Sequence, residues 1–234
     1  MKNCILLVSL LSFLGCSSIN SNSSELNSKQ RQGVPDSIVD SKLLTMYFEM
    51  KNSPNSIVID SAIALVDSMV YTYKSDDRVR FKYVLQKIQF LILDNRMDAA
   101  IDVVKSDSSA IWEEIGGPYY KEIIRYRLTA MSAKSKNNMN LYKSSIRSAL
   151  MLVEKYTAEN QKEYSGFLKS ELSLQKGKYY ITVQEFVYYS YLLYGKEETN
   201  RRLKEYQDLY NIPDSIIEQL KLLYDMDIMD FYPI

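Results

Sequence analysis

The side chains that most often carry catalysis are scarce in this 234-residue chain, which has no histidine and only two cysteines, Cys4 and Cys16. Without histidine, Ser-His-Asp and Cys-His catalysis, histidine-ligated zinc or haem, and histidine-based pH switches are excluded in their usual forms. Cys4 falls within the apolar start of the chain, so Cys16 is the thiol to explain. Carboxylates and hydroxyl groups are the other candidates for chemistry.

Three aspartates near the C-terminus, Asp225, Asp227 and Asp230, bring three carboxylates together and raise the possibility of a calcium-binding EF-hand loop. Such a loop needs an oxygen ligand where Met229 stands and a glycine where Asp230 stands. The cluster is therefore interpreted as a solvated helix end, and the sequence predicts no metal site.

Two other combinations resemble parts of known active sites. Glu113 and Glu114 could supply the acid of a glycosidase, but neighbouring helix residues point about 100° apart, so these two do not form a catalytic pair. Ser173 and Lys176 have the S-x-x-K spacing of penicillin-interacting acylases, without the accompanying S-D-N or K-T-G. We therefore expect no catalytic residue and no cofactor, and a protein that is not an enzyme.

Cys16 follows a short leader made of Lys2, an apolar run over Ile5–Leu14, and Gly15. As a helix, that run spans about 15 Å, half of a hydrocarbon core of roughly 30 Å, which fits an export signal rather than a membrane anchor. The segment from Phe13 to Cys16 resembles the lipobox of bacterial lipoproteins, although Phe13 and Leu14 depart from its commonest residues. The resemblance implies a signal peptide over 1–15 and a lipid, including palmitate-type acyl chains, on Cys16. The alternatives are an ordinary secretory signal and a buried N-terminal helix.

Residues 16–35 are expected to be the acylated cysteine and a disordered tether, since Ser17–Pro35 holds six serines and three asparagines. A flexible coil of that length reaches about 25 Å, enough to hold a domain clear of a bilayer. In the lipoproteins that the leader resembles, an Asp after the Cys favours the inner membrane. Ser17 stands there instead, so the resemblance implies a cell-envelope location on the periplasmic side of the outer membrane.

From Asp36 to Ile234 the apolar spacing is helical almost throughout, and we expect one all-helical domain. The repeat i, i+3, i+4, i+7 is typical of an amphipathic helix, and no stretch alternates convincingly with period two. Few turn-forming residues are present, with seven glycines and five prolines in the chain. The clearest helical spacings are those of Ala62, Ile63, Val66, Met69, Val70 and Tyr73, of Phe81, Val84, Leu85, Ile88, Leu91 and Ile92, and of Tyr142, Ile146, Ala149, Leu150, Val153 and Tyr156.

Turn residues recur at a nearly constant interval: Asn55, Asn95, Asn137 and Gly177 are 40, 42 and 40 residues apart. Each is expected at the middle of a helix pair, with weaker breaks between pairs, including one at Gly195. This layout predicts stacked antiparallel helix hairpins, with an irregular helical bundle as the alternative.

The segment Leu91–Lys105, with Asn95 at its turn and small residues in 98–101, resembles the middle of a tetratricopeptide repeat. Val84 and Ile88 occupy that repeat's aromatic and glycine positions. The resemblance implies a tetratricopeptide-like right-handed α-solenoid. Helix starts are predicted at three Pro-Asx-Ser phrases, two of which have capping-box spacing: Ser37 with Asp40, and Ser215 with Glu218.

The stretch 179–194 is apolar or aromatic around nearly the whole helix, apart from Gln184 and Glu185. It is best interpreted as a central buried helix. The alternative is a binding groove, because tyrosine offers a large contact area with a polar tip and loses little rotamer entropy. The candidate binding residues are Tyr179, Tyr180, Tyr188, Tyr191 and Tyr194.

The charges balance, with 29 basic and 29 acidic residues, so nothing points to nucleic acid as a partner. The leading hypothesis is a membrane-anchored lipoprotein that acts as a non-catalytic module for binding a protein, peptide or glycan. An immunity or inhibitor lipoprotein that neutralises a toxin or hydrolase is the alternative. A carboxylate-dependent glycan hydrolase ranks third and requires an Asp or Glu pair buried in a cleft.

Overall fold

A computed structural model describes residues 36–53, 55–162 and 174–229 of the chain. The predictions made for the leader 1–15, for Cys16 and for the tether that ends at Pro35 lie outside these residues. Across the described ranges the regular structure is helical and includes no strand, so the predicted all-α class is confirmed. The helices are α2 (Asp36–Asn52), α3 (Ser56–Thr72), α4 (Asp77–Leu93), α5 (Met97–Ser106), α6 (Ile111–Gly116), α7 (Tyr120–Ser135), α8 (Met139–Glu159), α10 (Leu174–Tyr210) and α11 (Asp214–Lys221).

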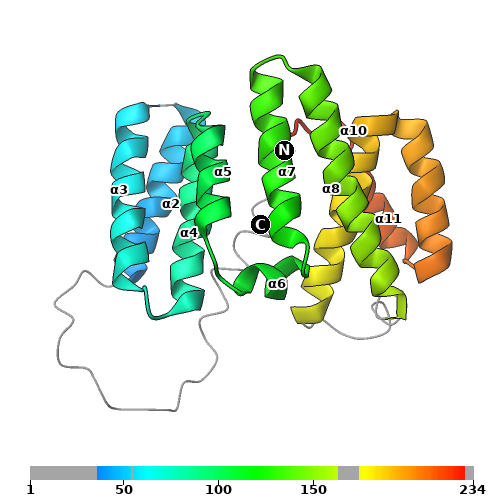
Figure 1. Cartoon of the computed structure of the whole chain (residues 1–234), viewed down its shortest axis with the longest axis horizontal. Coiled ribbons are helices and arrows are strands. Elements are labelled where there is room, and N and C mark those ends of the chain that lie inside the picture. The colour runs from blue at the N-terminus through cyan, green and yellow to red at the C-terminus, as the bar shows by residue number, and fades with distance from the viewer. Residues whose placement is uncertain (1–35, 54, 163–173, 230–234) are drawn as a thin grey trace, which may run out of the picture.

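Consecutive helices pack against one another along an elongated molecule (Figure 1). The pairs α2 and α3, α4 and α5, and α7 and α8 are antiparallel hairpins, and each hairpin also packs on the next. The short helix α6 lies crosswise between the α4–α5 and α7–α8 hairpins and contacts α4, α7 and α10. The finer assignment, a tetratricopeptide-like solenoid, stays a prediction.

Two of the predicted turns use an asparagine in the left-handed region, with φ of 56° at Asn95 and 57° at Asn137. At each turn the next backbone N–H reaches back to the end of the preceding helix. Arg96 N–H donates to the Leu91 carbonyl, and Asn138 N–H donates to the Ala133 carbonyl, both at 2.8 Å. This is the bonding of a Schellman motif, and asparagine tolerates the left-handed region better than most residues. Both predicted turns are confirmed.

The turn predicted at Gly177 is wrong, because Gly177 lies inside α10. A single glycine costs a helix only about 1 kcal/mol, so it need not end one. The chain bends instead at Gly195, where φ is 78° and ψ is −179°. Gly195, which was expected to separate two helix pairs, is thus the turn within the last pair.

The two capping boxes are also wrong. The helix start predicted at the second Pro-Asx-Ser phrase is confirmed, because the Asn55 side chain caps α3 by accepting from Ile57 N–H. Helix α2 begins at Asp36, so Ser37 is already inside it. Helix α11 begins at Asp214 with Pro213 as its N-cap and no capping bond from a side chain. Proline's fixed φ lets a helix begin directly after it, one residue before the predicted serine.

The core is divided into two clusters that share α4. The smaller cluster is formed by α2, α3 and the side of α4 that carries Tyr83 and Phe90. The larger cluster is formed by the other side of α4, which includes Ile88, and by the helices from α5 onward. The half-buried Ile63 and Val70 of α3 contact both clusters. Helix α4 is therefore the structural link between the two ends of the molecule.

Within the described residues, no helix is long and apolar enough to cross a membrane.

Candidate functional site

The aromatic part of α10, residues 179–194, is interpreted from the sequence as a central buried helix, with a binding groove as the alternative. Tyr188 is fully buried there, and its hydroxyl donates to the Met226 carbonyl at 3.0 Å. Tyr179 and Tyr180 are half-buried against the larger core. Burial raises the pKa of the Tyr180 hydroxyl. Tyr188 is consequently a core residue rather than part of a binding surface, since its polar tip is satisfied inside the protein.

Tyr191 and Tyr194 lie closer to the surface. Tyr191 stacks on Tyr224 with ring centroids 5.1 Å apart, and its hydroxyl donates to an Asp225 carboxylate oxygen at 3.1 Å. Tyr194 is 47% exposed, and the Arg202 guanidinium carbon lies 5.1 Å from the centroid of its ring. The five tyrosines do not share one exposed face, and the helix mainly fulfils the core role that its sequence favours.

A charged pair lies inside the larger core between α7 and α10. Arg127 Nη1 is 3.7 Å from Glu185 Oε1, and both side chains are almost completely buried. The Tyr189 hydroxyl donates to the same Glu185 oxygen at 3.3 Å. Burial raises the pKa of Glu185 to about 7, although the Arg127 guanidinium opposes that change. Glu185 was present in the sequence analysis only as an interruption of an apolar helix.

This pair bears on the hydrolase hypothesis. Glu185 is a buried acid, as a glycosidase requires, but among the described residues the charged group beside it is a guanidinium rather than a second carboxylate. It also lies among core residues instead of in a cleft. The arrangement can hold or release a proton, yet it does not provide the two opposed carboxyl groups of glycoside hydrolysis.

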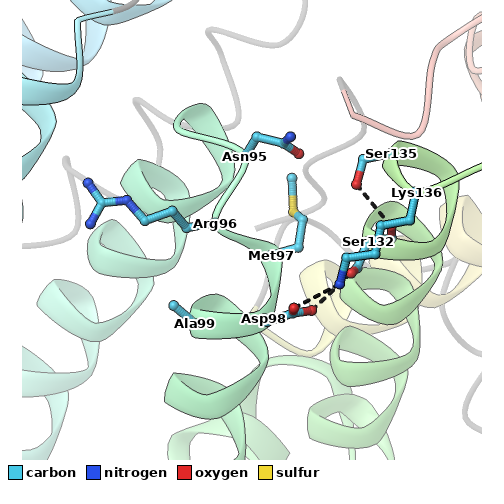
Figure 2. A pocket seen from close by; sticks show the side chains of 8 residues that line it. All are labelled: Asn95, Arg96, Met97, Asp98, Ala99, Ser132, Ser135 and Lys136. Atoms are coloured by element: carbon cyan, nitrogen blue, oxygen red, sulfur yellow. Dashed lines mark hydrogen bonds and ion pairs between the residues drawn. The ribbon is translucent and has the colours of Figure 1, made fainter.

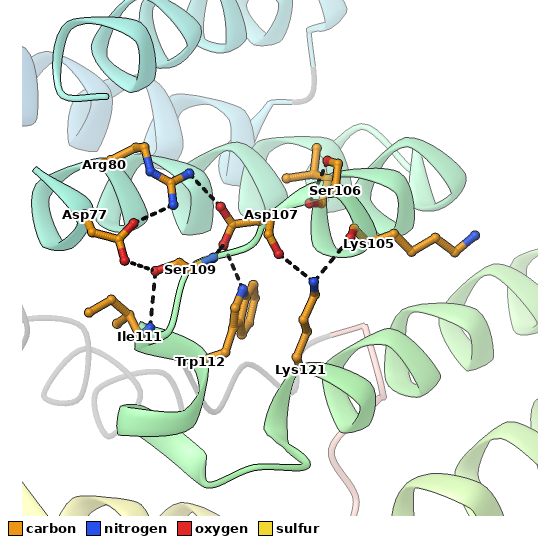
Figure 3. Close-up of polar contacts among 10 residues, drawn as sticks. Asp77, Arg80, Lys105, Ser106, Asp107, Ser109, Ile111, Trp112 and Lys121 are labelled. Atoms are coloured by element: carbon orange, nitrogen blue, oxygen red, sulfur yellow. Dashed lines mark hydrogen bonds and ion pairs between the residues drawn. The ribbon is translucent and has the colours of Figure 1, made fainter. Parts of the chain in front are cut away.

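A second polar network joins the segment after α5 to its neighbours (Figure 3). The buried Asp107 carboxylate accepts from Arg80 Nη1 at 2.6 Å and from Trp112 Nε1 at 2.8 Å. Arg80 also pairs with Asp77, whose other oxygen accepts from Ser109 Oγ at 2.7 Å. These bonds to Arg80 and Ser109 lower the pKa of Asp77.

The backbone of the same segment is held by Lys121, whose Nζ donates to the Asp107 carbonyl at 2.5 Å and to the Lys105 carbonyl at 3.2 Å. Helices α4, α5, α6 and α7 are thus tied together where α6 crosses between two hairpins (Figure 3). Since every polar atom named here has a partner within the protein, the network positions helices rather than a ligand.

A shallow pocket of about 240 Å³ lies between the α4–α5 turn and the end of α7 (Figure 2). Its charged groups already pair with each other, because Lys136 Nζ and Ser132 Oγ donate to Asp98 at 2.8 and 2.9 Å. The bond from Lys136 is the main reason that the pKa of Asp98 is lowered. Arg96 points away from the pocket (Figure 2) and pairs with Asp94. The lining residues are Asn95, Arg96, Met97, Asp98, Ala99, Ser132, Ser135 and Lys136.

The acidic C-terminal cluster makes internal contacts. Asp227 pairs with Lys134 of α7 and accepts from Met229 N–H at 2.9 Å. Asp225 accepts from Tyr191. Asp230 lies outside the described residues, and no group of three or more metal-ligating side chains occurs in the described ranges.

The remaining sequence candidates have ordinary surroundings. Glu114 pairs with Arg78 at 2.7 Å on the surface, and Glu113 is exposed. Ser173 lies outside the described residues.

Comparison with known proteins gives no match among family models, curated proteins or solved structures.

Exposed apolar side chains are the surface feature that the sequence analysis did not single out. The first hairpin carries five of them, and on α3 Ile57 is 77% exposed and Tyr71 is 73% exposed. These two are fourteen residues apart, close to four helical turns, so they lie on nearly the same side of α3. Ser61, Ala64 and Ser68 lie between them on that side and are exposed. The outer side of α3 is thus a row of small exposed residues with a large apolar residue near each end.

Proposed function

We propose that this protein is a membrane-anchored, periplasm-facing lipoprotein that acts as a non-catalytic module for binding a protein or peptide. The observation that carries the proposal is the order of its parts. A leader that resembles a lipobox ends at Cys16, a polar segment follows, and a helical array begins at Asp36. Stacked helix pairs bury their cores against one another and leave their outer sides for partners.

The outer side of α3 supports the binding part of the proposal. Large apolar residues on a surface contribute most to binding when a partner covers them. Ile57 and Tyr71 are exposed to solvent on α3, which lies at one end of the molecule (Figure 1). A helical or extended peptide segment laid along α3 covers both side chains at once.

The anchor is tested by replacing Cys16 with serine. Without the thiol, no thioether to diacylglycerol forms, so the variant is expected to lose fatty-acid labelling and to leave the membrane fraction. Metabolic labelling with palmitate, followed by membrane extraction at high pH, measures both properties. Cys4→Ser is the matched control and keeps both. A Cys16→Ser variant that is still labelled and membrane-bound contradicts the lipoprotein assignment.

The binding surface is tested by the double substitution Ile57→Glu and Tyr71→Glu. Cross-linking in native membranes, followed by purification of the chain, is expected to recover a reproducible protein partner. The double variant weakens that interaction roughly tenfold or more, because two apolar contacts are replaced by charges. Leu222→Glu, at a residue 58% exposed near the other end, is the control and keeps the partner. Repeated failure to recover any partner contradicts the binding function without affecting the anchor.

A further inference from the structure

The Arg127–Glu185 pair is the group in the described structure whose placement calls for an explanation beyond packing. Arg127 comes from α7 and Glu185 from α10, and the larger core surrounds both. The residues that follow Glu185 on α10, Phe186 to Ser190, are all buried. An ionised carboxylate at such a place is costly unless it is well compensated.

Compensation of the ionised carboxylate by the described residues comes from two long contacts. The guanidinium nitrogen at 3.7 Å is too far for a hydrogen bond, and the Tyr189 hydroxyl donates at the long distance of 3.3 Å. A neutral carboxyl group avoids the cost of burying a charge, and it keeps a donor and an acceptor. The site therefore suits the protonated form well and the charged form only moderately.

Among the described residues, the ionisable groups around Glu185 belong to few elements. From α7, Arg127 and Tyr120 act on it electrostatically, and from α10 itself Tyr189 does so. The carboxylates of neighbouring helices are engaged or directed elsewhere: Glu113 and Glu114 of α6 are exposed, Glu154 of α8 pairs with Arg202, and Glu218 of α11 pairs with Lys221.

We propose that Glu185 is an internal proton-binding site, and that loss of its proton as the pH rises weakens the part of the larger core where α10 faces Arg127 of α7. A protein exposed at the cell envelope experiences external pH directly, and this chain has no histidine to respond to it. In this proposal, the buried Glu185 carboxyl group responds to pH as a histidine does in other pH-sensitive proteins. Its proton leaves to solvent water when the core around Glu185 opens, and Arg127 then partly balances the remaining charge.

The direction of the pH effect on stability follows from the linkage between proton binding and folding. Burial raises the pKa of Glu185 from 4.5 to about 7, so the folded protein binds this proton more tightly than the unfolded chain. Stability from this group is full below pH 4.5 and declines as the pH rises through 7. Between pH 5 and pH 8 the equilibrium constant for unfolding is expected to increase on the order of 50-fold from this group alone.

The experiment compares the full chain, purified in mild detergent, with its Glu185→Gln variant. Urea unfolding at pH 5 and pH 8 is followed by the fluorescence of Trp112, the one tryptophan of the chain, which lies in the same core. The 50-fold dependence is expected in the wild type and absent in Glu185→Gln. Glu114→Gln, which removes an exposed acid, is the control and keeps the dependence.

A second measurement does not depend on the folding of the variant. With ¹³C-labelled glutamate, one carboxyl carbon of the wild type is expected to titrate near pH 7. If no glutamate titrates above about pH 6, or if Glu185→Gln has the same pH dependence as the wild type, the proposal is overturned.

Discussion

Replacement of Arg127 by methionine is expected to destabilise the folded protein by about 3 kcal/mol at pH 8 and by less at pH 5. Methionine keeps most of the length of the side chain but removes the positive charge that faces Glu185 at 3.7 Å. At pH 8 a buried carboxylate then loses its compensating charge, whereas at pH 5 Glu185 holds its proton and needs little compensation. Urea unfolding at both pH values, followed by Trp112 fluorescence, measures the difference.

Arg125→Met is the matched control, because Arg125 is also on α7 but pairs with Glu122 near the surface. Its cost is expected to be about 1 kcal/mol or less, and similar at both pH values. The double variant Arg127→Met and Glu185→Leu is expected to be more stable at pH 8 than Arg127→Met alone, since no buried charge remains. Equal losses at pH 5 and pH 8 for Arg127→Met contradict the electrostatic explanation.

The helices and several turns could be predicted from the sequence because they depend on local chemistry. Asn95 and Asn137 each follow a helix whose apolar spacing is regular, and both adopt the left-handed conformation that asparagine tolerates. Gly177 fails as a prediction for an equally physical reason. Glycine permits a turn without requiring one, so its sequence position could not distinguish it from Gly195, where φ is positive.

The polar interior could be predicted only in part. Gln184 and Glu185 stood out as polar residues in an apolar helix, which indicates that something inside the protein must receive them. The partner, Arg127, comes from another helix, and only the folded chain brings its side chain to within 3.7 Å of Glu185. Tyr188 illustrates the same limit, because only the folded chain brings the Met226 carbonyl to its hydroxyl.

The largest effect outside the Arg127 pair is expected at Asp107, where Asp107→Ala should cost about 3–5 kcal/mol. The buried carboxylate accepts from Arg80 and Trp112 at 2.6 and 2.8 Å, and more weakly from Ser109 N–H at 3.4 Å. Alanine leaves the Trp112 N–H without this acceptor and leaves Arg80 with Asp77 as its ion-pair partner. Urea unfolding of the variant measures the loss.

Asp107→Asn separates charge from hydrogen bonding, because the amide oxygen can still accept from Trp112. Its expected cost is therefore smaller, about 1–2 kcal/mol. Asp102→Ala on α5 is the matched control: Asp102 is 77% exposed and its contact with Lys105 is 3.7 Å long, so a change within about 0.5 kcal/mol is expected. Since Asp107 ties α4 to α6 where two hairpins meet, its loss is also expected to open the 107–119 segment to proteases before other parts of the chain. A variant as stable and protease-resistant as Asp102→Ala shows that apolar packing alone holds the hairpins together.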